Sequence, residues 1–466
     1  MLFSSIPYLY YFFPVALLLY FAAPRKFKNI ILLFVSLVFY FFGEQGFVIL
    51  LLASIAVGYI AGRIVEKYRG TGKSKLALFL AIILNLLLLG FFKYSDFFIS
   101  NLNALLGTSI PLLRVTLPLG ISFFVFQTIS YVADVYRGLT ADRNPVGFAM
   151  YVSMFPQLVA GPIVRYNTVA EAINNRVHSF DSFAKGVSRF AIGLAKKVLI
   201  ANTLGELSAT MLATGDPTVA SYWIAIFAYV LQIYFDFSGY SDMAIGLGHM
   251  LGFHFDENFN YPLIADSISD FWRRWHISMG TWFREYLYIP LGGNRVSNLK
   301  WVRNIFIVWF CTGFWHGANW NFILWGLYFG ILLALEKLVL GKLIAKLPAI
   351  LRHIYTLVLV LFSFVMFYIE NLTDMLAHIR GMFGASGISV YNPETLYYLR
   401  SYAVLLVVAC IGSTPLLRNL VNRLRERASV GKLFLVLEPV YYAILLIIAT
   451  GYVVDSSFNP FLYFRF

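Results

Sequence analysis

Long apolar stretches constrain the fold of this chain more than any other feature. A helix needs about 20 apolar residues to cross the roughly 30 Å of hydrocarbon in a bilayer. The candidate spans are residues 6–23, 46–62, 76–92, 117–135, 148–164, 221–236, 304–335, 354–368, 401–416 and 434–453, and the shorter or more mixed stretches 29–42 and 190–207 add to these. The sequence therefore predicts an all-α, polytopic transmembrane helical bundle with roughly ten to twelve spans, including re-entrant or in-plane amphipathic helices.

The composition excludes an ordinary soluble protein. Of the 466 residues, 60% are hydrophobic and only 13% are charged, whereas about a quarter of the residues in a typical soluble domain are charged. No linker or low-complexity tract divides the chain, and no polar stretch is long enough for a separate soluble domain. We therefore expect a single integral membrane domain over residues 1–466, with residues 456–466 as a C-terminal tail.

The basic residues indicate membrane topology rather than nucleic-acid binding. The formal net charge is +13, but the Lys and Arg residues lie between the apolar runs and not on one soluble face. Basic residues mark the cytoplasmic ends of spans and attract anionic lipid headgroups. Arg25, Lys26 and Lys28 follow the first apolar run, so the N-terminus is expected outside, and the basic cluster within 63–75 is expected back inside.

One histidine lies inside an apolar run. His316 sits within 304–335, where an ionisable group is expensive and usually faces a cavity. If the segment is helical, Thr312, His316 and Asn319 share one face. A neutral imidazole there suits a general base, because its pKa near 6.5 favours proton removal at physiological pH. The alternative is a core histidine that hydrogen-bonds between helices.

The region 254–303 interrupts the apolar rhythm. Residues 268–288 are compatible with one helix that carries an aromatic stripe and a polar stripe, so it is expected to lie along an interface or to re-enter the bundle. The aromatic stripe is Trp272, Trp275, Met279, Trp282 and Tyr286, and the polar stripe is Arg274, Ser278, Thr281 and Glu285. His276 lies in this segment, either as part of a site or as an interfacial histidine amid aromatic anchors.

Charged residues near these histidines admit two interpretations. Arg273, Arg274 and Arg284 can hold the phosphates of a nucleotide-bearing donor through charge-assisted hydrogen bonds, or they can hold lipid phosphates. Asp236 and Asp242 need internal partners, such as Arg or His from the region that follows, and a buried structural network is the favoured interpretation. No metal is expected, because no spacing of a known ligand motif is present.

Several segments together resemble one family. They are YFDFSGYSDMAIGLG at 234–248, ENFN at 257–260, FWRRWHISMGTWFREYLYIPLGGNR at 271–295, WHGAN at 315–319, FPQLVAGPIVR at 155–165 and residues 118–138. In this order they resemble the membrane-bound O-acyltransferase family, and more narrowly its bacterial branch that contains the membrane subunit of alginate O-acetylation. The resemblance spans nearly the whole chain.

The resemblance implies a site and a reaction. His316 occupies the position of the family's catalytic histidine, and His276 matches the second recurrent histidine of the bacterial branch. The expected donor is cytoplasmic acetyl-CoA, with Asn319 helping to stabilise the oxyanion. The acetyl group would be made available outside the bacterial cytoplasmic (inner) membrane to a secreted or membrane-anchored acetyltransferase that modifies a cell-surface polysaccharide. Alginate, peptidoglycan, cellulose and other exopolysaccharides stay open as acceptors.

The C-terminal residues 458–466 resemble the tail of the small partner protein in teichoic acid D-alanylation. By that resemblance Tyr463 would accept the acyl group on its phenol oxygen while His316 removes the proton. The alternative for Tyr463 is an aromatic-belt residue at the membrane interface. Two other functions stay open from the sequence, namely D-alanyl transfer to teichoic acid and non-enzymatic transport of a glycolipid.

Overall fold

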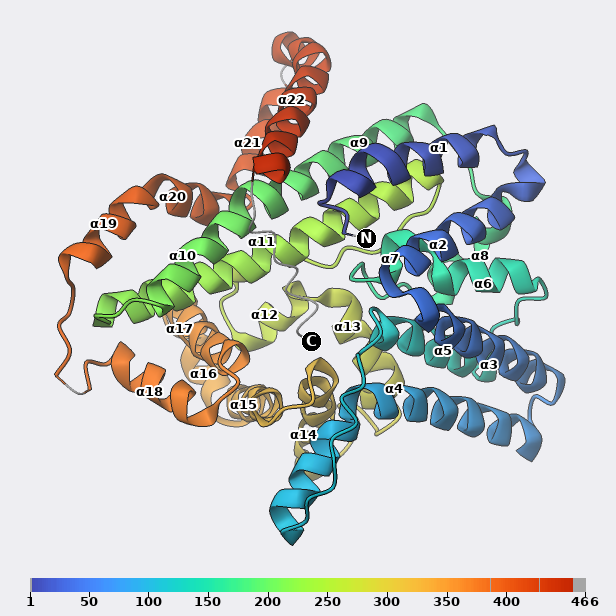
Figure 1. Cartoon of the computed structure of the whole chain (residues 1–466), viewed down its shortest axis with the longest axis horizontal. Helices are drawn as coiled ribbons and strands as arrows, with labels where there is room; N and C mark the ends of the chain where they lie inside the picture. Colours follow the sequence, from blue (N-terminus) through green and yellow to red (C-terminus); the bar gives the residue numbers. More distant parts are fainter. Residues whose placement is uncertain (1, 386, 427, 456–466) are drawn as a thin grey trace. The chain divides into compact units, whose positions relative to one another are not determined.

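A computed structural model describes residues 2–385, 387–426 and 428–455 of the chain (Figure 1). Within these residues all regular structure is helical and no strand occurs, which confirms the all-α class. The chain divides into two compact units. Unit 1 comprises Met1–Phe190 and Ser241–Asp256, and unit 2 comprises Ala191–Tyr240 and Glu257–Phe466.

Unit 1 holds the N-terminal helices. They are η1 (Pro7–Phe12), α1 (Phe13–Ala22), η2 (Arg25–Phe27), α2 (Lys28–Glu44), η3 (Gln45–Phe47), α3 (Val48–Lys67), α4 (Gly72–Leu106), α5 (Ile121–Tyr136), α6 (Pro145–Ser153), α7 (Phe155–Leu158), α8 (Tyr166–Asn175) and most of α9 (Phe180–Ala195). The last part of α11 (Val219–Leu251) also belongs to this unit.

Small and polar residues join α3, α4 and α5 in unit 1. Gly58 of α3 lets α5 approach closely, because a Cβ there would lie 2.5 Å from a side-chain carbon of Thr128. The Ser54 hydroxyl donates to the Asn85 Oδ1 at 2.7 Å and lies 3.1 Å from the Thr128 hydroxyl. Close packing at small residues and hydrogen bonds between side chains are the means by which helices associate in lipid.

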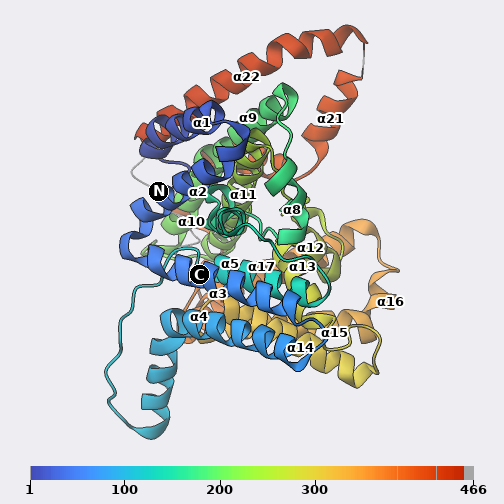
Figure 2. The same cartoon turned by 90° about the vertical axis from the view of Figure 1, so that its right-hand side faces the viewer.

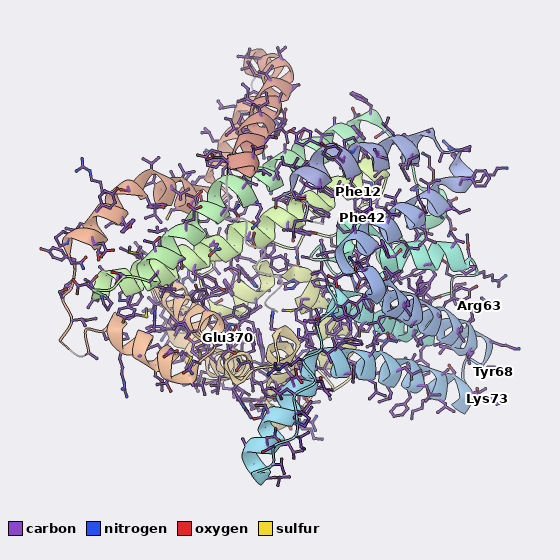
Figure 3. All side chains as sticks on the ribbon, viewed as in Figure 1. Phe12, Phe42, Arg63, Tyr68, Lys73 and Glu370 are labelled. Carbon is purple, nitrogen blue, oxygen red and sulfur yellow. The ribbon has the colours of Figure 1, made fainter. Side chains whose placement is uncertain are left out.

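The turn between α3 and α4 carries the second basic cluster. Figure 3 labels Arg63, Tyr68 and Lys73 at this end of the two helices. The Arg63 guanidinium pairs with Glu66 at 2.9 Å, and the Lys73 ammonium lies 5.1 Å from the centroid of the Tyr68 ring. The turn therefore has the basic, aromatic character of a membrane interface.

Unit 2 holds the remaining helices. They are η4 (Lys196–Ala201), α10 (Asn202–Leu212), the first part of α11, η5 (Pro262–Ile264), α12 (Ile268–Arg274), α13 (Ile277–Phe283), η6 (Arg284–Tyr288), α14 (Asn298–His316), α15 (Trp320–Leu335), η7 (Glu336–Leu340), α16 (Gly341–Ile344), α17 (Ala349–Tyr368), α18 (Leu372–Met382), α19 (Pro393–Ser401), α20 (Ala403–Gly412), α21 (Leu416–Arg425) and α22 (Ala428–Asp455). Helices α14 and α15 pack side by side (Figure 2).

Within the described residues, six helical runs are long and apolar enough to cross a membrane, and a bent pair would make a seventh. They are Arg25–Lys67, Gly72–Leu106, Val219–Leu251, Trp320–Ile344, Ala349–Tyr368 and Val436–Asp455, with Pro393–Ser401 and Ala403–Gly412 as the pair. The run Arg25–Lys67 contains both α2 and α3, and the apolar helix Ile121–Tyr136 is too short to be included. The ten to twelve spans therefore stay a prediction.

Candidate functional site

His316 lies at the end of a helix and not in the middle of one. The predicted span 304–335 is two helices, because α14 ends at His316 and α15 begins at Trp320. A Cβ at Gly317 would collide with the ring of Phe322, so glycine is needed where the chain turns between them. Thr312 still lies one turn before His316. Asn319, however, has extended backbone (φ −150°) beyond the helix, so its predicted place on the same helical face is wrong.

Aromatic rings surround the His316 side chain, which is buried. Its ring lies edge-on to Trp325 with centroids 5.0 Å apart, and edge-on to Phe367 at 5.3 Å. The ring of Trp315 lies 5.0 Å away. Edge-to-face contacts of this kind are favourable and fix the plane of a ring. The imidazole is therefore held in a defined orientation.

The indoles beside His316 include hydrogen-bond donors that the fold does not use. Trp272 lies 4.6 Å from Trp309 and 5.6 Å from Trp325, measured between ring centroids. The Nε1 atoms of Trp272 and Trp325 are buried and have no acceptor within the described residues. Buried indole N–H groups usually find a partner, so these two donors have capacity for a further hydrogen bond.

His276 occupies a break between α12 and α13. Its backbone is left-handed (φ 45°, ψ 52°), a conformation that costs a residue with a Cβ about 1–3 kcal/mol and persists where the surroundings enforce it. Here the Ile277 N–H donates to the Asn258 carbonyl at 3.0 Å and the Ser278 N–H donates to Asn258 Oδ1 at 3.2 Å. Residues 268–288 are thus not one continuous helix, and that prediction is wrong.

The hydrogen bonds of Asn258 also determine the tautomer of His276. Asn258 Oδ1 accepts from both the N–H and the hydroxyl of Ser278, and it lies 3.2 Å from His276 Nδ1. Burial lowers the pKa of His276 to about 3, so the imidazole is neutral at physiological pH. Since its neighbour is an acceptor, Nδ1 carries the proton and Nε2 carries the lone pair.

The two histidines meet at one tryptophan. The Trp315 ring lies 6.2 Å from the His276 ring and 5.0 Å from the His316 ring, measured between centroids. Phe237 of α11 lies edge-on to His276 at 4.7 Å. The predicted site residues His276 and His316 are therefore part of one aromatic cluster in unit 2.

A buried carboxylate fixes the start of α12. Glu336 accepts from the backbone N–H groups of Ile268 at 2.7 Å and Ser269 at 3.0 Å, and also from the Ser269 hydroxyl at 3.0 Å. A negative charge at a helix N-terminus is favourable because it compensates the unpaired N–H groups and the helix dipole. Neither Glu336 nor Asn258 was predicted from the sequence to have such a role. The sequence held one signal for each residue. Glu336 is an acidic residue at the end of an apolar run, and Asn258 lies in the ENFN segment.

The three arginines predicted to hold nucleotide phosphates have separate local partners. Arg273 and Arg284 are exposed, with Arg273 donating to the Ser269 carbonyl and Arg284 lying 3.5 Å from Glu285. Arg274 pairs with Asp270 at 2.8 Å and donates to the Asn260 carbonyl at 3.3 Å. Their role in donor binding therefore remains a prediction, and Tyr463 lies outside the described residues.

The two carboxylates of α11 each form an ion pair with a basic side chain. In unit 2, Asp236 pairs with Lys197 at 2.5 Å, and in unit 1, Asp242 pairs with Arg189 at 2.8 Å. Both partners come from α9 or η4, so the expectation that they follow in the sequence is wrong, although both carboxylates do have internal partners. Among the described residues no three His, Cys, Asp or Glu side chains are arranged to hold a metal ion.

The comparison with protein families decides the class of enzyme. Residues 114–377 match the model of the membrane-bound O-acyltransferase family, and they include both histidines of the aromatic cluster. The chain belongs to the membrane-bound O-acyltransferase family. It is therefore an acyltransferase and a multi-pass membrane protein, as its apolar helices also indicate.

Three relatives are similar to the chain over different shares of its length. The probable alginate O-acetylase AlgI of Azotobacter vinelandii is 42% identical over 419 residues, which are 88% of this chain and 84% of that protein. The peptidoglycan O-acetyltransferase of Helicobacter pylori is 36% identical over 429 residues, which are 84% of this chain and 81% of that protein. The teichoic acid D-alanyltransferase of Bacillus subtilis is 28% identical over 228 residues, which are 46% of this chain and 58% of that protein.

Proposed function

We propose that this acyltransferase passes acetyl groups from cytoplasmic acetyl-CoA across the bacterial cytoplasmic (inner) membrane for O-acetylation of a cell-surface polysaccharide. The observation that carries the proposal is the buried pair His276 and His316, which meet at Trp315. Similarity over more than four fifths of the chain to proteins named as alginate and peptidoglycan O-acetylating enzymes supports acetyl as the group. Acceptor choice belongs to an extracellular acetyltransferase partner.

In the proposed reaction, His316 acts as general base. Its imidazole takes the proton of an attacking hydroxyl, whose oxygen adds to the thioester carbonyl carbon. The carbon–sulfur bond then breaks, the acetyl ester forms, and the CoA thiolate takes the proton back from the imidazolium. Asn319 and the Nε1 donor of Trp325 stabilise the oxyanion between these steps.

The remaining residues take supporting roles in this proposal. His276 presents its Nε2 lone pair as a second proton acceptor, with Asn258 holding the ring. Arg273, Arg274 and Arg284 hold the phosphates of the donor. Tyr463 accepts the acetyl group on its phenol oxygen and gives it to the partner transferase, which completes the transfer to the polysaccharide.

The test is acetyl transfer by the purified chain with labelled acetyl-CoA, followed by mass spectrometry of the C-terminal peptide. We expect label on Tyr463 in the native chain and none in His316→Ala or Tyr463→Phe. The control His254→Ala removes an exposed histidine and should keep the label. Trp325→Phe keeps an aromatic ring but removes the N–H donor, and should lower kcat by about 100-fold.

The same assay separates the alternatives. A chain that transfers D-alanyl groups but not acetyl groups would contradict the proposed donor. Absence of label and of acetyl-CoA turnover, with a partner transferase supplied, would contradict acetyl transfer as a whole. Normal labelling in Trp325→Phe would remove only the indole from the mechanism.

A further inference from the structure

Unit 1 contains a basic cavity that the acyl-transfer site does not use. It has a volume of about 420 Å³ and is lined by η2, the start of α2, the end of α8 and the segment after α8. Its charged lining residues are Arg25, Lys26, Lys28 and Arg176, and His178 also lines it. A cavity of this size is typical of small-ligand sites.

The positive charge of this cavity has no acidic counterpart. Its lining contains four cationic side chains and no Asp or Glu, and no ion pair joins any of the four to a carboxylate within the described part of the chain. The C-terminus of α8 supplies the equivalent of about half a negative charge. That compensates only a fraction of four unit charges, so the cavity keeps a net positive charge that favours an anion.

Arg176 is held in place with one side of its guanidinium unused. Its Nη2 donates to Asn29 Oδ1, and its central carbon lies 4.6 Å from the ring centroid of Phe253 and 5.6 Å from that of Tyr20. Its Nη1 is buried and has no partner within the described residues. Stacking on two rings fixes the plane of the guanidinium, so the free edge is already positioned to bind an oxyanion.

Hydrogen bonds connect the polar side chains next to Arg176. The Lys28 ammonium donates to the Tyr20 carbonyl at 2.8 Å and lies 4.3 Å from the centroid of the Tyr20 ring. The Tyr20 hydroxyl donates to the Leu251 carbonyl at 2.8 Å and lies 2.9 Å from His178 Nε2. Burial, then Lys28 and Arg176, lower the pKa of His178, so the cations and not this histidine supply the charge.

We propose that this cavity binds a phosphate group, which Arg176 contacts through its free edge and Arg25, Lys26 and Lys28 neutralise. A phosphate presents several oxygens at once and suits a planar guanidinium with neighbouring ammonium groups. Arg25, Lys26 and Lys28 directly follow the first apolar run, at the predicted cytoplasmic end of that span. Two sources fit this chemistry there, a phospholipid headgroup and the phosphates of a free nucleotide.

The test compares two double variants of equal charge in the full-length purified chain. Arg25→Gln with Arg176→Gln alters the cavity, and Lys67→Gln with Lys75→Gln alters exposed lysines outside it. A second cavity variant, Arg25→Gln with Lys26→Gln, changes only exposed side chains. It replaces the first cavity variant if the Arg176 substitution prevents folding. The probes are phosphatidylglycerol, counted by native mass spectrometry, and adenosine 3′,5′-bisphosphate, measured by calorimetry.

We expect the cavity variants to lose about tenfold or more in affinity for one probe, while the control stays within about twofold of the native chain. Loss of phosphatidylglycerol binding alone assigns a lipid headgroup, and loss of bisphosphate binding alone assigns a free nucleotide. Unchanged binding of both probes, or equal losses in cavity and control variants, would overturn the proposal. If the native chain turns over no acetyl-CoA but the lipid result holds, the proposed function fails and the phosphate site stands.

Discussion

At the scale of single residues, one amide oxygen orients His276. Asn258 Oδ1 accepts the Ser278 hydroxyl at 2.9 Å and lies 3.2 Å from His276 Nδ1. We predict that Asn258→Ala lowers kcat for acyl transfer by about tenfold or more, because each buried donor left without a partner costs about 1–3 kcal/mol. Ser278→Ala keeps the bond to His276 and should lose less than about threefold. Equal losses in the two variants, measured as acetyl-CoA turnover, would contradict an orienting role.

The same histidine gives the fold a pH dependence. Burial lowers the pKa of His276 to about 3, against about 6.5 in an unfolded chain. Between these values the unfolded state binds more protons, so stability falls as pH falls below 6.5. At pH 5 the loss from this residue is about 2 kcal/mol.

Thermal unfolding in detergent at pH 7 and pH 5 measures that loss. His276→Asn removes the titrating group and suits the left-handed backbone, because Asn tolerates positive φ. We expect its unfolding temperature to fall less between the two pH values than that of the native chain. His254→Asn changes an exposed histidine and should behave like the native chain. An identical shift in all three would show that His276 does not carry the effect.

At the scale of elements, the position of α12 depends on Glu336. Its two oxygens accept both N–H groups at the start of the helix. We predict that Glu336→Gln lowers acyl transfer by about tenfold, since an amide has one acceptor oxygen and brings no charge to the helix dipole. Tyr355→Phe removes only a weak 3.4 Å contact to the same carboxylate and serves as the control. Hydrogen exchange of the α12 amides should rise only in the Glu336 variant.

The sequence predicted the helices better than their breaks. Apolar length and periodicity were enough to predict an all-α membrane protein, and His316 was predicted as an ionisable residue inside an apolar run. The prediction of His276 as a site residue came from the family resemblance. The break at His276 depends on hydrogen bonds to Asn258, and the break at Gly317 depends on the ring of Phe322. The first is a tertiary contact and the second is local, and neither changes the apolar periodicity over 268–288 or 304–335.

At the scale of the whole molecule, breaks of this kind explain why apolar runs and membrane spans do not correspond one to one. The run 304–335 is a helical hairpin in which Gly313 and Gly326 bring α14 and α15 into close contact. The run Arg25–Lys67, in contrast, joins α2 and α3 in 43 residues. A count of spans therefore needs the side of the membrane on which each turn lies.

The helix α4 offers the sharpest test of topology, because Gly72–Leu106 is long enough to cross and its ends are chemically different. Basic residues precede it, so Thr71 is expected in the cytoplasm and Thr108 outside. After Cys311 and Cys410 are replaced by serine, we predict that an impermeant maleimide labels Thr108→Cys in intact cells and labels Thr71→Cys only after the cells are permeabilised. Both should react in denatured protein. Labelling of both cysteines in intact cells would mean that α4 does not cross the membrane. Labelling of Thr71→Cys but not Thr108→Cys in intact cells would place the first basic cluster, with its cavity, outside.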